Sequence, residues 1–190
     1  VANLDPKKGH RVLAEAARRV LAERDDVRFV CAGKGERAEL DALLDAAGVA
    51  RDRFVHLGFH DDVPRLLRTL DVSICASTKG EGLTGSIRES LAMGVPVVST
   101  AVAGNVEIVK HGQTGLLVPP RDPDALAAAI LETLADPDAA RARAEAGAAL
   151  VRGRFTSAAR AERMAELYRE IRTYRRVREM EVDSILYPEV

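Results

Sequence analysis

Apolar residues recur along this chain in two distinct patterns. Where they are spaced three and four residues apart, as in residues 10–23, they predict an amphipathic helix, whereas short continuous apolar runs next to glycine predict buried strands. Strands are predicted at the opening of the chain and at residues 27–32, 54–57, 72–76, 96–99 and 116–118. Helices are predicted at residues 10–23, 36–47, 61–70, 85–93 and 104–110, and again from residue 122, at 138–151 and at 157–180.

The order of these elements predicts an α/β fold. Strands that alternate with helices are βαβ units, and their right-handed crossovers build a parallel sheet. We therefore expect a Rossmann-like, doubly wound parallel sheet of about six strands with helices on both faces. After Pro119 and Pro120 the chain is helical and alanine-rich, which predicts additional C-terminal helices. A length of 190 residues suffices for one such domain with a full core.

Composition argues against nucleic acid and metal as partners. The chain has 28 basic and 29 acidic residues, so it lacks the positive charge that binds DNA or RNA. Aromatic residues make up 4% and tryptophan is absent, which leaves few side chains for base stacking. The four histidines lack the spacing of metal ligands, and no Ser-His-Asp arrangement is visible.

The cysteines and the apolar runs bear on location. Cys31 and Cys75 lie in apolar, strand-like runs, which predicts buried reduced thiols and a reducing, cytoplasmic compartment. No signal peptide or membrane-spanning run is visible, and a chain that opens on Val1 is expected to be a piece of a longer protein. Residues 171–179 are locally basic; they suit either peripheral contact with the inner face of a membrane or a partner domain, or simply an exposed helix face.

Candidate chemistry follows three of the predicted strands. In an open parallel sheet, ligands bind beyond the carboxyl ends of the strands. The first loop, Asn3-Leu-Asp-Pro-Lys-Lys-Gly9, could place the ammonium group of Lys7 or Lys8 against a phosphate. Lysine pairs near helix starts are common on protein surfaces, so this loop alone is weak support for a site.

The second loop, Gly33-Lys34-Gly35-Glu36-Arg37-Ala38, matches the G-x-G-x-x-A fingerprint of dinucleotide sites. That fingerprint normally follows the first strand of its unit, and an acidic residue should end the next strand, but Phe54-Val-His-Leu-Gly-Phe has none. A tight turn, with its backbone near a nucleobase, is the simpler interpretation.

The third loop is the most informative, because two glutamates flank a glycine-rich turn in Glu81-Gly-Leu-Thr-Gly-Ser-Ile-Arg-Glu89. The amides of residues 82–85 lead into a helix and can point at an anion, which the helix dipole also attracts. Glu89 lies about one turn into that helix, where its carboxylate can accept hydrogen bonds from a diol. Glu81 would face the group beyond the phosphates. A solvated loop acid and a solvated helix acid are the alternative.

With these residues in view, the chain resembles the C-terminal, donor-binding half of family 4 (group 1) retaining glycosyltransferases of the GT-B fold. Their E-x7-E motif is matched by Glu81 and Glu89. Segments 90–100, 102–109 and 112–119 resemble the blocks that follow that motif, and residues 1–9 resemble the opening strand and lysine loop. The similarity runs from residue 1 to about 170, and the ordered combination is more specific than any single motif.

The resemblance implies a hexosyltransferase-like enzyme that transfers a sugar from a nucleotide-diphosphate sugar with retention of configuration, without an essential metal or other cofactor. It implies catalytic roles for Lys8, which would bind the donor diphosphate, and for Glu81, which would contact the donor sugar. The implied nucleotide-binding residues are Asn3, Lys8, Gly33, Lys34, Gly82, Leu83, Thr84, Gly85 and Glu89, the last binding the ribose. Many members have an arginine where this chain has Asn3, so Lys8 is expected to neutralise more of the charge.

By the same resemblance, residues 1–170 are expected to form the donor domain and residues 171–190 a C-terminal helical extension. The family's N-terminal, acceptor-binding domain is absent from this chain, so little or no transfer by the chain alone is expected. Three alternatives stay open: a non-catalytic nucleotide-sugar-binding module, one half of a GT-B epimerase, and an NAD-binding oxidoreductase domain. Binding of nucleoside diphosphates without NAD would exclude the last.

Overall fold

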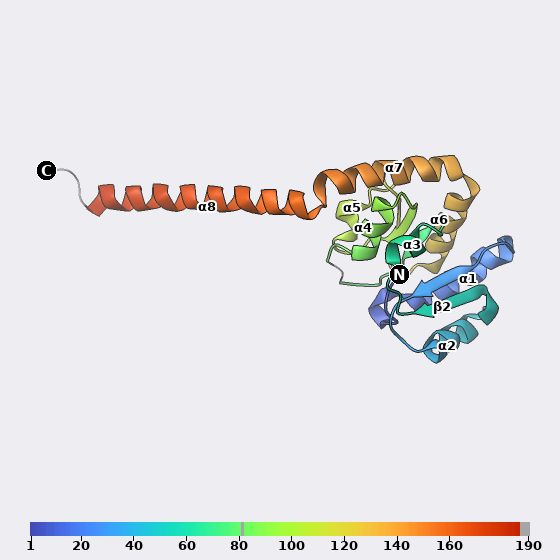
Figure 1. Cartoon of the computed structure of the whole chain (residues 1–190). Coiled ribbons are helices and arrows are strands. Elements are labelled where there is room, and N and C mark those ends of the chain that lie inside the picture. Colours follow the sequence, from blue (N-terminus) through green and yellow to red (C-terminus); the bar gives the residue numbers. More distant parts are fainter. Residues whose placement is uncertain (81, 187–190) are drawn as a thin grey trace. The chain divides into compact units, whose positions relative to one another are not determined.

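The computed structural model describes residues 1–80 and 82–186, and side chains as far as residue 175 (Figure 1). The chain divides into two compact units, Val1–Val151 and Arg152–Val190. Glu81, one of the predicted site residues, lies outside the described residues. The functional boundary expected at residue 170 stays a prediction.

The first unit is an α/β structure built on parallel strands, as the sequence predicted. Its strands are β1 (Phe29–Ala32), β2 (Phe54–Gly58), β3 (Ser73–Cys75), β4 (Val97–Thr100) and β5 (Leu116–Val118). β1 pairs with β2, with Phe29 opposite Phe54, and the other three pair in the order β3-β4-β5. Because every pairing is parallel, the carboxyl ends of paired strands open at the same edge.

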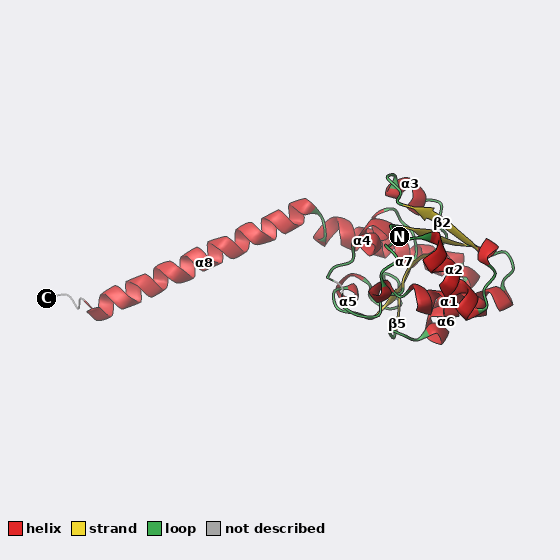
Figure 2. Ribbon diagram, turned by 90° about the horizontal axis from the view of Figure 1, so that it is seen from below, coloured by secondary structure: helices red, strands yellow, loops and turns green. Residues whose placement is uncertain are grey.

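Helices alternate with the strands along the chain (Figure 2). In the first unit they are α1 (His10–Glu23), α2 (Arg37–Ala47), α3 (Val63–Leu67), α4 (Gly85–Ala92), α5 (Asn105–Ile108), α6 (Pro123–Ala135) and α7 (Pro137–Arg154, which ends just beyond it), with short 3-10 turns at Pro6–Lys8 and Arg51–Arg53. The Asp62 and Asp122 side chains accept hydrogen bonds from the backbone N–H groups of Arg65 and Ala125, which caps α3 and α6.

The second unit consists of α8 (Ser157–Leu186) and the residues on either side of it. Residues 171–175 of this helix are exposed, as far as its side chains are described. Among the described residues, no helix combines the length and apolar character needed to cross a membrane.

Five strands are assigned in the described residues, and the predicted opening strand is an extended segment instead. The Ala2 N–H donates to the Ala32 carbonyl at 2.8 Å, and the Leu4 N–H donates to the Lys34 carbonyl at 2.7 Å. The segment therefore runs beside the chain as it leaves β1. The structure has fewer strands in the described residues than the roughly six predicted, because this segment meets β1 only at its carboxyl end, where two hydrogen bonds form no ladder.

The core of the first unit lies between the strands and their covering helices. All four residues of β4 are buried, as expected for a middle strand covered on both faces. The rings of Phe29 and Phe54 stack across β1 and β2 with centroids 4.8 Å apart. α1 packs against α6, with Ala16, Ala17 and Val20 buried in the same cluster as residues of α6. This packing fixes the strand ends from which the candidate site loops emerge.

Candidate functional site

The first loop is pressed against the carboxyl end of β3. Gly9 has a φ of +73°, and a Cβ at this position would lie 1.9 Å from the Ala76 carbonyl oxygen. In addition, the Thr78 N–H donates to the Lys7 carbonyl at 2.8 Å. The lysine loop is therefore tied to the segment that leads from β3 into the third loop, although the two loops are about 70 residues apart in sequence.

The two lysines of this loop have different surroundings. The Lys7 ammonium lies 3.5 Å from the Asp5 carboxylate, and both side chains are more than 40% exposed. Lys8 is half-buried and lines a cavity of about 760 Å³ between β1 and β3. The residues alone left the choice between Lys7 and Lys8 open, and the resemblance implied Lys8. Of the two lysines, Lys8 is the one that lines the cavity.

The third loop contributes to the same cavity. Thr84 and Ser86 line it together with Lys8 and His10. Residues 82–85 lead directly into α4, whose first residue is Gly85. Gly82 is exposed and Leu83 is half-buried, so their backbone lies near solvent at the mouth of the helix. The structure thus brings the first and third loops together, as predicted.

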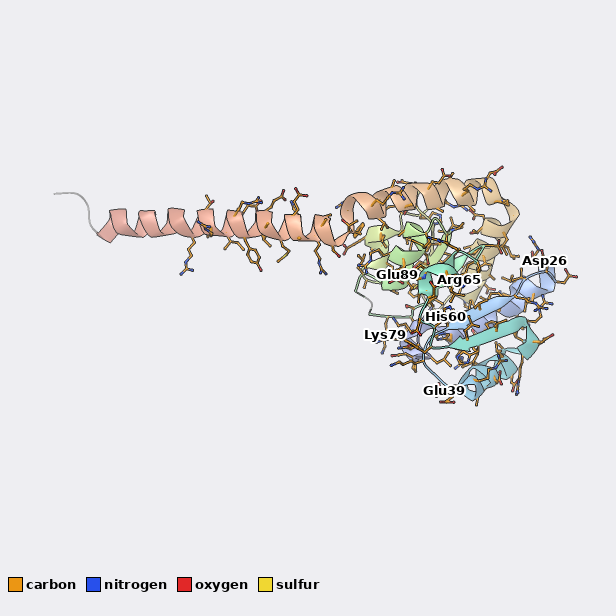
Figure 3. The ribbon with its side chains drawn as sticks, in the orientation of Figure 1. Asp26, Glu39, His60, Arg65, Lys79 and Glu89 are labelled. Carbon is orange, nitrogen blue, oxygen red and sulfur yellow. The ribbon has the colours of Figure 1, made fainter. Side chains whose placement is uncertain are left out.

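Glu89 projects from α4 (Figure 3). A Cβ placed on Gly85 would lie 3.7 Å from Glu89 Oε1, so the carboxylate reaches back along α4 to its first residue. Glu89 and Lys8 also both influence the pKa of the Val1 α-amino group. Burial lowers the pKa of the Val1 α-amino group; the Glu89 carboxylate opposes this shift, whereas the Lys8 charge adds to it. Of these two charged side chains, Lys8 lines the cavity, whereas Glu89 is exposed.

The second loop is bound to the opening segment. Asn3 Oδ1 accepts a hydrogen bond from the Lys34 N–H at 2.9 Å. A Cβ on Gly33 would lie 2.1 Å from the Ala2 carbonyl oxygen, and one on Gly35 would lie 2.5 Å from Leu4 Cβ. Both glycines are thus needed for close approach of two stretches of backbone, which supports the tight-turn interpretation. The Lys34 ammonium lies 5.8 Å from the centre of the exposed Phe59 ring.

Burial shifts the pKa of two groups near this site, His10 and Cys31. Burial, with smaller effects from the charges of Val1, His56 and Lys8, lowers the pKa of His10 to about 4. Burial raises the pKa of the Cys31 thiol, and both Cys31 and Cys75 are free and buried, as predicted.

In the part of the chain that the structure describes, no group of three or more His, Cys, Asp or Glu residues could hold a metal ion.

Comparison with known proteins identifies the family. Residues 1–136 match the family model described as glycosyl transferases group 1. This chain belongs to the group 1 glycosyltransferases. It is 32% identical over 174 residues to the alpha-D-kanosaminyltransferase of Streptomyces kanamyceticus, a match that covers 90% of this chain and 45% of that protein. The chain thus spans about half the length of the curated relatives it matches.

Solved structures of glycosyltransferases share the fold. Alr3699/HepE from Anabaena in complex with UDP-glucose is 28% identical with a TM-score of 0.80, covering 88% of this chain and 47% of that one. The C-terminal domain of a group 1 family protein (LpcC) from Francisella tularensis is 25% identical with a TM-score of 0.72. That match covers 83% of this chain and 84% of that domain.

Sequence reasoning about this glycosyltransferase chain missed the residues behind the third loop. Asn105 is fully buried and accepts a hydrogen bond from the Thr84 hydroxyl. The available signal was a single amide side chain among the mostly apolar residues of Val102-Ala-Gly-Asn-Val-Glu-Ile-Val. Because a buried polar side chain needs partners, that asparagine could have been predicted to bind a neighbouring loop.

Proposed function

We propose that this chain is the donor-binding domain of a retaining glycosyltransferase that uses a nucleotide-diphosphate sugar. The observation that carries the proposal is that Lys8 of the first loop and Thr84 of the third loop line one cavity at the carboxyl ends of parallel strands, while the Glu89 carboxylate reaches back to Gly85 at the start of α4. Support comes from the similar Anabaena protein, whose structures contain UDP and UDP-glucose, and from the match to a separate C-terminal domain.

The roles proposed for the residues follow from their chemistry. The Lys8 ammonium and the amides of residues 82–85 would bind the donor diphosphate and stabilise its charge as it leaves, which is electrostatic preorganisation. Glu89 would accept hydrogen bonds from the two ribose hydroxyls. Glu81 would contact the donor sugar. Gly33 and Lys34 would form the base-side wall. Asn3, which stands where many members have an arginine beside the phosphates, would support the second loop by accepting the Lys34 N–H.

Transfer would need more than this chain. We propose that residues 1–170 form the donor domain, that 171–190 extend it, and that a separate acceptor domain completes the active site in the full-length enzyme. On this proposal the reaction needs no essential metal, because Lys8 and the loop amides neutralise the diphosphate. The full-length enzyme would act in the cytoplasm, at the inner face of the membrane where the acceptor requires it.

Calorimetric titration of this chain with UDP, GDP, ADP and NAD tests the proposal. At least one nucleoside diphosphate should bind, NAD should not, and Glu89→Ala should weaken nucleotide binding by about tenfold through loss of two charge-assisted hydrogen bonds. The matched control is Glu39→Ala, an exposed glutamate on α2 that lies away from the 82–85 loop (Figure 3).

Three results would count against the proposal. NAD binding without nucleoside diphosphate binding would replace the transferase with an oxidoreductase. Equal affinities in the Glu89 and Glu39 variants would remove the ribose role of Glu89. Donor binding without transfer to any acceptor, once an acceptor domain is supplied, would favour a binding module or epimerase half.

A further inference from the structure

Thr84 occupies the N-cap position of α4 but does not cap the helix. Threonine is a preferred N-cap residue because its side-chain oxygen usually accepts a hydrogen bond from an N–H group of the first helical turn. Thr84 makes no such bond, although its extended backbone, with φ −66° and ψ 121°, is that of an ordinary N-cap. Its carbonyl accepts the Arg88 N–H at 3.3 Å, so the helix begins normally.

The Thr84 hydroxyl is used elsewhere. It donates to Asn105 Oδ1 at 2.5 Å, in a fully buried environment. The Asn105 amide group in turn donates to Ser99 Oγ at 3.1 Å and to the Thr100 carbonyl at 3.3 Å. Asn105 therefore connects the start of α4 to β4, a strand buried along its whole length.

The residue before Asn105 brings the backbone of the third loop against the same support. A Cβ on Gly104 would lie 2.9 Å from the Gly82 carbonyl oxygen and from the Leu83 nitrogen. Only a glycine allows this approach. The loop thus rests on Gly104 through its backbone at residues 82–83 and on Asn105 through its side chain at residue 84.

We propose that Asn105 is a positioning residue of the donor site, because it draws the Thr84 hydroxyl away from α4 and leaves the first-turn amides open to a diphosphate. Without Asn105, the Thr84 oxygen could rotate to cap the helix and compete with the phosphate for the same N–H groups. This inference rests on the proposed function, since it concerns the amides that bind the donor.

The test is a double-mutant cycle on the 190-residue chain, read out as nucleotide affinity by calorimetry. The probe is whichever of UDP, GDP and ADP binds the unmodified chain most tightly. Asn105→Ala should weaken its binding by about tenfold, whereas Thr84→Val, which has no hydroxyl to cap α4, should bind about like the unmodified chain. Adding Thr84→Val to Asn105→Ala should restore most of the lost affinity. Thr84→Ser, which retains the hydroxyl, should bind like the unmodified chain.

A second measurement separates positioning from general stability. Thr114→Val is the matched control: Thr114 is buried, does not line the cavity, and its hydroxyl donates to the Ile108 carbonyl at 2.9 Å, so its loss should alter urea stability but not affinity. If Asn105→Ala fails to fold, Asn105→Ser, whose shorter side chain no longer reaches the Thr84 hydroxyl, makes the same comparison with and without Thr84→Val. Unchanged affinity in Asn105→Ala, or a double variant that binds as weakly as Asn105→Ala, would overturn the inference. Absence of any nucleoside diphosphate binding by the unmodified chain would overturn the proposed function itself.

Discussion

At the scale of single residues, the site is lined by a histidine with an unusual environment. His10 is the first residue of α1, and its Nδ1 is buried with no hydrogen-bond partner among the described residues. Burial, then the charges of the Val1 amine, His56 and Lys8, lowers its pKa from 6.5 to about 4, and Asp5 opposes the shift only weakly. His10 is therefore neutral at pH 7, and it adds no positive charge beside Lys8.

This shift predicts a pH-dependent stability. Between about pH 4 and pH 6.5 the unfolded chain binds a proton on His10 that the folded chain does not, so stability rises with pH across this range. We expect this group to lower the free energy of unfolding by roughly 1–2 kcal/mol at the acid end, allowing for solvent screening. Urea denaturation of His10→Gln at both ends of the range should show a flatter dependence; an unchanged slope would contradict this account.

At the scale of elements, the turn into α1 determines where Lys8 lies. A side chain at residue 9 is disfavoured for two reasons. Gly9 has a left-handed backbone, and a Cβ on it would clash with the Ala76 carbonyl oxygen. The sequence shows a glycine after two lysines, which predicts a turn, but not that β3 is the surface against which the turn packs. That contact joins segments far apart in the chain and depends on the sheet.

We therefore expect Gly9→Ala to cost about 3 kcal/mol or more, because both the backbone strain and the clash must be relieved. Displacing the lysine loop should also weaken nucleoside diphosphate binding. Gly153→Ala in α7 is the control, since a Cβ there meets nothing within 4 Å, and it should be neutral or slightly stabilising. Equal denaturation midpoints for Gly9→Ala and Gly153→Ala would contradict this expectation, because they would show that the turn at residue 9 accommodates a side chain without loss of stability.

At the scale of the whole molecule, the first unit ends within α7. α7 covers α4 closely: a Cβ on Gly147 would lie 2.5 Å from Leu91 Cδ2 and 3.1 Å from the Thr114 carbonyl oxygen. The helix that bears Glu89 is thus supported from behind by an element that comes some 50 residues later. The second unit begins at Arg152.

Truncation should separate these parts. A chain ending at residue 156, just beyond α7, should keep its nucleotide affinity within about twofold, since the first unit has its own core. A chain ending at residue 136 should lose both stability and binding, because α4 loses the cover of α7. Calorimetry and thermal denaturation of the two chains make the comparison. Loss of binding by the chain that ends at residue 156 would assign part of the site to residues beyond 156.

The sequence by itself determined the α/β class, the order of elements and the three loops at the sheet edge, because these depend on periodicity and on glycine and charge at short range. Only the tertiary structure showed that Lys8 rather than Lys7 lines the cavity, that the opening segment is extended beside the end of β1 without forming a ladder, and that Asn105 lies behind Thr84. The physical reason is common to all three. Each depends on contacts between segments that the sheet brings together, and the sequence of one segment does not show which other segment it will contact.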